Sequence, residues 1–160
     1  MKYTTLGKTG LKVSVVGLGG IPVQRTDKAE AVEIVNACME QGINYLDTAR
    51  GYTVSEEFFG EAIKPYRDKW ILATKSMART YEGMKADIET SLKNLQTDYI
   101  DLYQFHGRMT LEEQNKVLQS TGTRRRVVIA TNIAESSITI DGITSVKGGA
   151  VANEPWAEKE

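Results

Sequence analysis

Short apolar runs alternate with longer amphipathic stretches along most of the 160 residues, and this alternation constrains the fold more than any other feature. Strands that alternate with helices usually build a parallel sheet covered by those helices. The apolar runs lie at 13–20, 43–49, 70–75, 99–105, 125–131 and 142–146. Because a closed eight-stranded barrel needs about 200 residues or more, we predict an α/β fold with an open, mostly parallel sheet of five to six strands.

Helical periodicity fills the gaps between these runs. Asp27 is expected to cap a helix that continues to about Gln41, and Ser55 is expected to cap a short helix after it. Further helices are expected over 82–95 and 110–119, where apolar residues recur every three or four positions. The flanking helices of the predicted sheet would come from these segments.

The two ends of the chain differ in character. The opening KYTTLGKTGLKV has two short extended pieces around glycines, which predicts a small β-hairpin. Residues 1–146 are expected to form one α/β domain, and 147–160 an irregular C-terminal tail. With no signal-peptide core, no apolar run that could span a membrane and one cysteine, we expect a cytoplasmic protein with no membrane partner. The formal charge of −1 makes nucleic acid an unlikely partner.

Four polar residues fall at or just after the ends of successive predicted strands: Asp47, Tyr52, Lys75 and His106. The carboxyl ends of parallel strands share one edge of the sheet, where α/β proteins place their chemistry. Lys75 is expected to lower the pKa of the Tyr52 phenol, with Asp47 holding the ammonium. With His106 to orient the proton, such a group could protonate a carbonyl oxygen while hydride arrives at the carbon.

A plainer interpretation stays open beside the catalytic one. A Lys and an Asp at strand ends often form a structural ion pair, and a Tyr beside a His need not be catalytic. Gly19 and Gly20 follow the first strand but do not form a G-x-G-x-x-G fingerprint. They suit a tight turn under the mouth of a pocket. No metal site is predicted.

Residues 1–106 closely resemble the first half of an aldo-keto reductase. The matching stretches are YTTLGKTGLKVSVVGLGG, GINYLDTARGY followed by SEEFFGEAI, WILATK, and SLKNLQTDYIDLYQFH. The resemblance implies a TIM-barrel fold, NADP(H) as hydride source and a small carbonyl substrate. It also implies that Asp47, Tyr52, Lys75 and His106 are the catalytic tetrad, with Tyr52 as proton donor.

Residues 106–143 resemble a different family, the second RecA-like domain of DEAH-box RNA helicases. VVIATNIAESSITIDG is close to their motif V, which contacts the RNA backbone and couples it to ATP. The phosphate loop GxxxxGK[ST] and the acidic box are absent from the sequence, so ATPase or helicase activity is not expected. We therefore interpret the chain as a chimera, in which the half barrel 1–106 is joined to a helicase-derived fragment at 107–146. An engineered origin is the main interpretation, and a gene fusion or an assembly artefact is the alternative.

The interpretation as a chimera sets the expected function. Gly19, Gly20 and Asp47 are candidate cofactor-binding residues. Thr131-Asn132 is a further candidate, because the grafted strand ends there and the reductases commonly hold the nicotinamide carboxamide at the equivalent strand end; a simple turn is the plainer interpretation. In the reductases, later strands hold the nucleotide's phosphates. We expect NADP(H) to bind weakly or not at all, and little or no carbonyl reduction. The alternatives are a working NADP(H)-dependent reductase and a nucleic-acid-binding helicase fragment, and copies of the chain could associate to cover exposed sheet edges.

Overall fold

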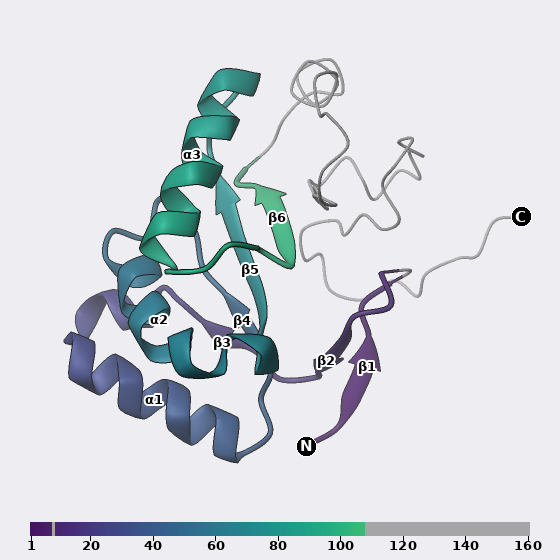
Figure 1. The fold of residues 1–160 in the computed structure, drawn as a ribbon. Coiled ribbons are helices and arrows are strands. Elements are labelled where there is room, and N and C mark those ends of the chain that lie inside the picture. Colours follow the sequence, from purple (N-terminus) through teal and green to yellow (C-terminus); the bar gives the residue numbers. More distant parts are fainter. Residues whose placement is uncertain (8, 108–160) are drawn as a thin grey trace, which may run out of the picture.

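A computed structural model describes residues 1–7 and 9–107. Its elements follow the chain as a hairpin and then strands that alternate with helices (Figure 1). The strands are β1 Tyr3–Thr5, β2 Lys12–Ser14, β3 Leu18–Gly19, β4 Tyr45–Asp47, β5 Ile71–Ser76 and β6 Leu102–Phe105. The helices are α1 Lys28–Glu40, α2 Ser55–Ile63 and α3 Tyr81–Asn94, with 3-10 turns η1 Pro22–Arg25 and η2 Lys64–Lys69.

The strands β3, β4, β5 and β6 form a parallel sheet in chain order, and the three α-helices lie along one side of it (Figure 1). This arrangement confirms the predicted α/β fold with a parallel sheet. The small N-terminal hairpin of β1 and β2 is also confirmed, since these strands pair antiparallel. The predicted strands at 125–131 and 142–146, the helix at 110–119 and the tail lie outside the described residues. The association of copies through sheet edges stays a prediction.

The capping predictions for the helices have mixed outcomes. Asp27 caps α1 as predicted, because its Oδ1 accepts a hydrogen bond from the Glu30 amide at 2.9 Å. Ser55 was wrong as a cap: Val54 precedes α2, and Ser55 lies inside the helix with its hydroxyl 2.9 Å from that of Thr48. A buried hydroxyl partner therefore outweighed the local preference of serine for a helix end.

The prediction of a single buried strand over 13–20 was wrong. The chain forms β2, bends, and then forms the much shorter β3, leaving Val15 and Val16 more than half exposed. The break follows from the hairpin, because the Ser14 amide bonds to the Asn44 side chain at 2.7 Å while the Ser14 hydroxyl donates to the Val16 carbonyl at 2.6 Å. Residues on the two sides of this bend therefore belong to different sheets.

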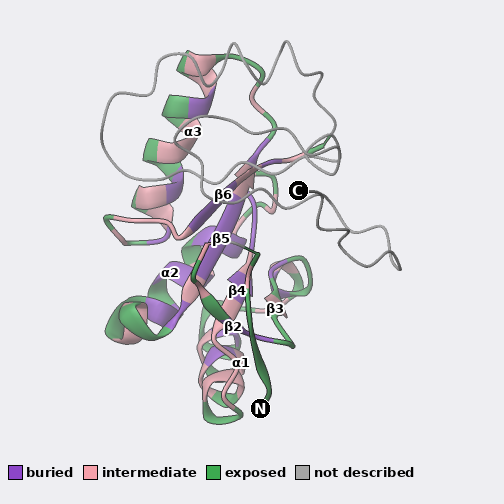
Figure 2. Cartoon of the chain, turned by 90° about the vertical axis from the view of Figure 1, so that its right-hand side faces the viewer, coloured by how far each residue is buried: buried purple, intermediate pink, exposed green. Residues whose placement is uncertain are grey.

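The main core lies between the sheet and helices α1 and α2. Its buried side chains include Leu46 and Leu72 from the strands, Val35 from α1, and Phe59 and Ile63 from α2. Figure 2 shows buried residues concentrated on the strands and on the helix faces turned toward them. Burial of this apolar area, at about 25 cal/mol per Å², supplies the main force that holds the sheet and its helices in register.

Arg67 ties together the amino ends of β5 and β6. Its guanidinium donates to the Trp70 carbonyl at 2.8 Å, the Tyr99 carbonyl at 2.9 Å and Asp101 Oδ2 at 2.7 Å, and lies 3.8 Å from the centroid of the Tyr99 ring. Asp101 in turn accepts from the Leu72 amide at 2.9 Å. This cluster fixes the strands from the edge opposite their carboxyl ends.

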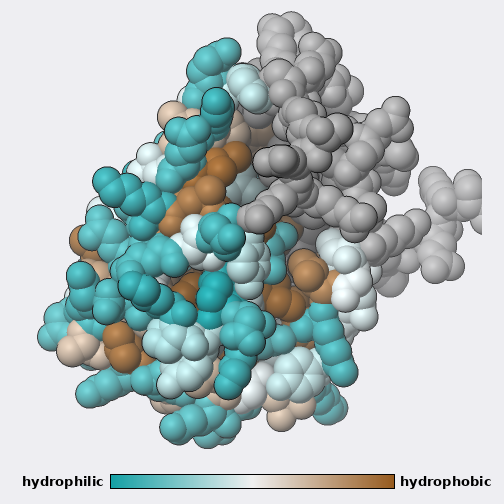
Figure 3. Space-filling model, viewed as in Figure 1, coloured by the Kyte–Doolittle hydropathy of each residue, from teal (hydrophilic) through white to brown (hydrophobic). Residues whose placement is uncertain are grey.

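The outer surface of the described part is mainly polar. Figure 3 shows hydrophilic residues over most of the face that carries the helices, with small apolar areas between them. Within residues 1–7 and 9–107, no helix has both the length and the apolar character needed to cross a membrane.

Candidate active site

An ion pair joins the carboxyl ends of β4 and β5. Lys75, the next-to-last residue of β5, donates from Nζ to Asp47 Oδ2 at 2.6 Å and to the Thr48 carbonyl at 2.8 Å. The parallel register brings these residues together, because Asp47 pairs with Ala73 and Lys75 with Gln104. Gln104 donates to the second oxygen of Asp47 at 3.2 Å, so both carboxylate oxygens of Asp47 accept hydrogen bonds.

Two rings lie beside this ion pair. The Tyr52 and His106 rings meet edge to face, with centroids 5.5 Å apart and planes at 88°. Lys75 Nζ lies 5.3 Å from the centroid of the Tyr52 ring. His106 follows β6 directly, and its amide donates to the Ser76 carbonyl at 2.7 Å. The structure thus brings Asp47, Tyr52, Lys75 and His106 together at one edge of the sheet, as the strand ends predicted.

The electrostatic state of Tyr52 differs from the prediction. Burial raises the pKa of the Tyr52 phenol, and the negative charge of Asp47 raises it further. The expected lowering by Lys75 was wrong, because the ammonium is already paired with Asp47 at 2.6 Å. Tyr52 therefore keeps its proton at neutral pH.

His106 is held in its neutral form. Burial lowers the pKa of its imidazole, and the Lys75 ammonium lowers it further, while Asp47 partly opposes both. Its Nδ1 is buried and has no hydrogen-bond partner within the described part of the chain. A neutral imidazole with an unused nitrogen can accept or donate one hydrogen bond at the site.

The two candidate glycines of the cofactor site differ in their surroundings. Gly19 pairs with Asp47 in the sheet, and a Cβ at Gly19 would meet nothing within 4 Å. Gly20 faces the packed interior, where a Cβ would lie 2.5 Å from Ser55 Oγ. Thr131 and Asn132 lie outside the described residues. In the described part, no three His, Cys, Asp or Glu side chains are grouped to hold a metal ion.

Sequence reasoning missed three residues that contact the site or support it. Gln104 lies in β6, two residues before His106. Side chains two residues apart in a strand point to the same face of the sheet, so this spacing could have predicted that Gln104 lies at the site. Arg50 and the fully buried Glu56 form an ion pair at 2.7 Å behind the loop of Tyr52. Glu56 gave no sequence signal, because glutamate is common in the first turn of a solvent-exposed helix.

A family model described as the aldo/keto reductase family matches residues 15–121. Aldo-keto reductase YhdN of Bacillus subtilis is 42% identical over 129 residues, which cover 66% of this chain and 38% of YhdN. L-galactose dehydrogenase of Arabidopsis thaliana is 37% identical over 122 residues, again covering 66% of this chain and 38% of that protein. The chain therefore spans about two fifths of the length of these curated relatives.

Solved structures give a consistent picture. The holo form of an aldo-keto reductase from Bacillus halodurans has 32% identity and a TM-score of 0.73, covering 94% of this chain and 58% of that one. An aldo/keto reductase from Klebsiella pneumoniae, solved with NADP and acetate, has 28% identity and a TM-score of 0.64, covering 78% and 48%. The family match passes His106 and ends at residue 121. The helicase-derived segment and the chimera stay predictions.

Proposed function

The chain belongs to the aldo/keto reductase family, and from that premise we propose that it acts in the NADP(H)-dependent reduction of small carbonyl compounds. One observation carries the proposal: Tyr52, Lys75, Asp47 and His106 gather at the carboxyl edge of a parallel sheet. Because the Tyr52 pKa is raised, the phenol keeps a proton that it can give to a substrate oxygen.

The surroundings of Asp47 fit the nicotinamide end of NADP(H). Gly19 lies beside Asp47 with open space where a side chain would be, which leaves room for a flat ring. The buried Nδ1 of His106, unpartnered within residues 1–7 and 9–107, supplies a polar atom that a ligand can satisfy. Gly19 and Asp47 would lie against the nicotinamide. When bound, NADPH supplies hydride to the carbonyl carbon.

The roles of the four side chains follow from their contacts. Tyr52 donates its phenolic proton to the carbonyl oxygen, and a proton from water later restores it. Lys75 stabilises the phenolate left behind, since its ammonium has three N–H groups and two of them are bonded to Asp47 and Thr48. Asp47 holds the ammonium in place, and neutral His106, edge to face with the tyrosine ring, orients the substrate oxygen.

The test is steady-state oxidation of NADPH with an aromatic aldehyde. Tyr52→Phe removes the proton donor and keeps the ring, so turnover should fall by about 10²- to 10⁴-fold, the usual contribution of general acid catalysis. Tyr66→Phe is the matched control, because Tyr66 lies in η2, at the amino end of β5. Equal turnover in the wild type and Tyr52→Phe would overturn the proposal.

A narrower hypothesis from the sequence is that the chain is a chimera. If residues 107–146 derive from a helicase, as their sequence resembles, the nucleotide phosphates lack the contacts that the family's later strands give. The proton-donating group would then survive in a scaffold with weak cofactor binding and little turnover. This hypothesis of a chimera rests on the resemblance of residues 106–143 to the helicase family.

A further inference from the structure

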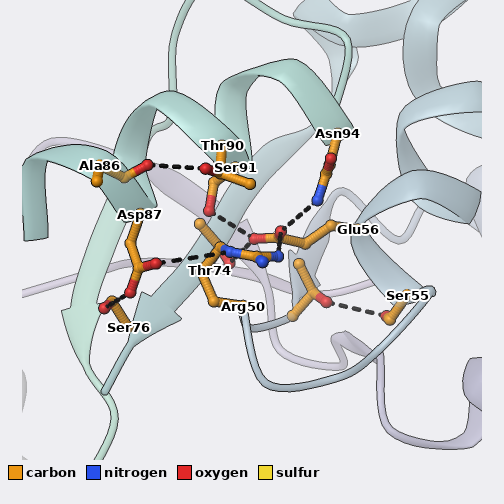
Figure 4. Close-up of polar contacts among 11 residues, drawn as sticks. Arg50, Ser55, Glu56, Thr74, Ser76, Ala86, Asp87, Thr90, Ser91 and Asn94 are labelled. Carbon is orange, nitrogen blue, oxygen red and sulfur yellow. Dashed lines mark hydrogen bonds and ion pairs between the residues drawn. The ribbon is translucent and has the colours of Figure 1, made fainter. Parts of the chain in front are cut away.

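A cluster of polar side chains, three of them buried and three half-buried, lies behind the loop that carries Tyr52. We call it the Glu56 cluster; its members are Arg50, Glu56, Thr74, Asp87, Ser91 and Asn94 (Figure 4). Glu56, in the first turn of α2, is fully buried, and its carboxylate accepts four hydrogen bonds. The donors are Arg50 Nη1 at 2.7 Å, Ser91 Oγ at 2.7 Å, Thr74 Oγ1 at 2.8 Å and Asn94 Nδ2 at 3.3 Å.

Such a site is demanding to build. A carboxylate taken out of water is strongly destabilised unless it is paired and fully hydrogen-bonded. Here the partners come from three separate segments, namely the loop after β4, strand β5 and helix α3. Glu56 therefore fixes the relative positions of these segments as well as packing between them.

Arg50 connects the Glu56 cluster to the site. Its amide donates to the Lys75 carbonyl at 2.9 Å, and its guanidinium binds Glu56. Two residues later stands Tyr52, whose own amide donates to the Ala49 carbonyl at 3.0 Å. The backbone of Arg50 is thus bonded to β5, and its side chain is bonded to the buried carboxylate of Glu56.

The loop that carries Tyr52 is strained. Thr53, directly after Tyr52, has φ +41°, a left-handed conformation that a β-branched residue rarely adopts. Strain of this kind persists only where the surrounding structure enforces it. The Thr48–Ser55 hydroxyl pair and the Arg50–Glu56 ion pair provide that restraint at the two ends of the loop.

We propose that Glu56, acting through Arg50, is a positioning residue that holds Tyr52 against Lys75 and His106. Its catalytic consequence rests on the proposed function, because only a reductase needs the phenol at a fixed place. The competing explanation is that the Glu56 cluster only packs α2 against α3. In that case its loss would destabilise the protein without moving Tyr52.

Glu56→Gln in the 160-residue chain, without a histidine tag, tests the proposal. The variant keeps the size of the side chain, but its amide NH₂ would face the donors of Arg50 or Asn94, so the loop should be released. The chain contains one histidine, so NMR signals of the His106 imidazole are unambiguous. Because Tyr52 contacts that ring edge to face, the His106 signals should shift, and kcat should fall about 10²-fold with KM little changed.

Arg67→Gln is the matched control. It breaks an ion pair of the same 2.7 Å length at the amino ends of β5 and β6. It should therefore destabilise the protein without changing the loop that carries Tyr52. Its His106 signals should stay as in the wild type. Should Glu56→Gln fail to fold, Arg50→Gln removes the same link and must give the same shift.

The outcomes separate this inference from the proposed function. Unchanged His106 signals in a folded Glu56→Gln or Arg50→Gln variant would overturn the inference, and so would an equal shift in Arg67→Gln. If the wild type shows no turnover while the signals shift as expected, the positioning of Tyr52 stands and the proposed reductase function fails.

Discussion

His106 makes the stability of the folded chain depend on pH. Burial and the Lys75 ammonium lower its pKa in the fold, so the unfolded state binds the proton more readily. A group of this kind contributes stability above its unfolded pKa of about 6.5, and the contribution is lost as pH falls through the lowered folded value. We predict that the urea midpoint falls between about pH 7 and pH 5, and that His106→Gln flattens the fall. Identical profiles for both proteins would contradict this.

The residues of the site were predictable as a group and not in their electrostatic state. Asp47, Lys75 and His106 lie at or just after strand ends, and parallel pairing alone brings strand ends together. The pKa of Tyr52 is raised instead of lowered, because it depends on burial and on where the Lys75 ammonium is bonded. Glu56 was missed for a similar reason, since its partners Thr74, Ser91 and Asn94 become neighbours only after the helices pack.

At the level of the elements, the contact of α2 with the end of α3 depends on the absence of a side chain. A Cβ at Gly60 would lie 2.8 Å from the backbone carbon of Leu95 and closer still to the Asn94 carbonyl oxygen. Backbone atoms cannot move aside cheaply, so Gly60→Ala should lower the free energy of unfolding by about 1–3 kcal/mol. Chemical denaturation measures this.

Gly51→Ala provides the control for that prediction. A Cβ at Gly51 would meet nothing within 4 Å, so the substitution should be neutral or stabilise by about 0.4–1 kcal/mol through the unfolded chain. Equal losses in both variants would show that helix packing is not the cause.

Helices and strands were predicted best where a local signal and the final packing agree. Asp27 caps α1 in the structure as it does in the sequence pattern. Disagreement marks places where distant residues decide, as at Ser55, which turns to Thr48, and at the bend after Ser14, which Asn44 holds. The 3-10 turns η1 and η2 carried a proline each but no periodic pattern.

At the scale of the whole molecule, the working reductase and the chimera differ in how tightly they would bind the phosphates of the cofactor. Each charge-assisted hydrogen bond to a phosphate contributes about 1.5–3 kcal/mol, so the loss of two or three weakens binding by several orders of magnitude. If residues 107–146 derive from a helicase, NADPH fluorescence titration should show no saturation below about 10 μM, whereas the proposed reductase should saturate below it. Saturation below that concentration would show that the phosphates are held, and would contradict the chimera.

The hydrogen bonds around Arg67 join the amino ends of β5 and β6, far from Tyr52 and its neighbours. The contacts of Arg67 and the candidate active site thus lie at opposite ends of the same strands. Substitutions around Arg67 can therefore raise or lower the thermal stability of the protein in small steps without changing the geometry around Tyr52.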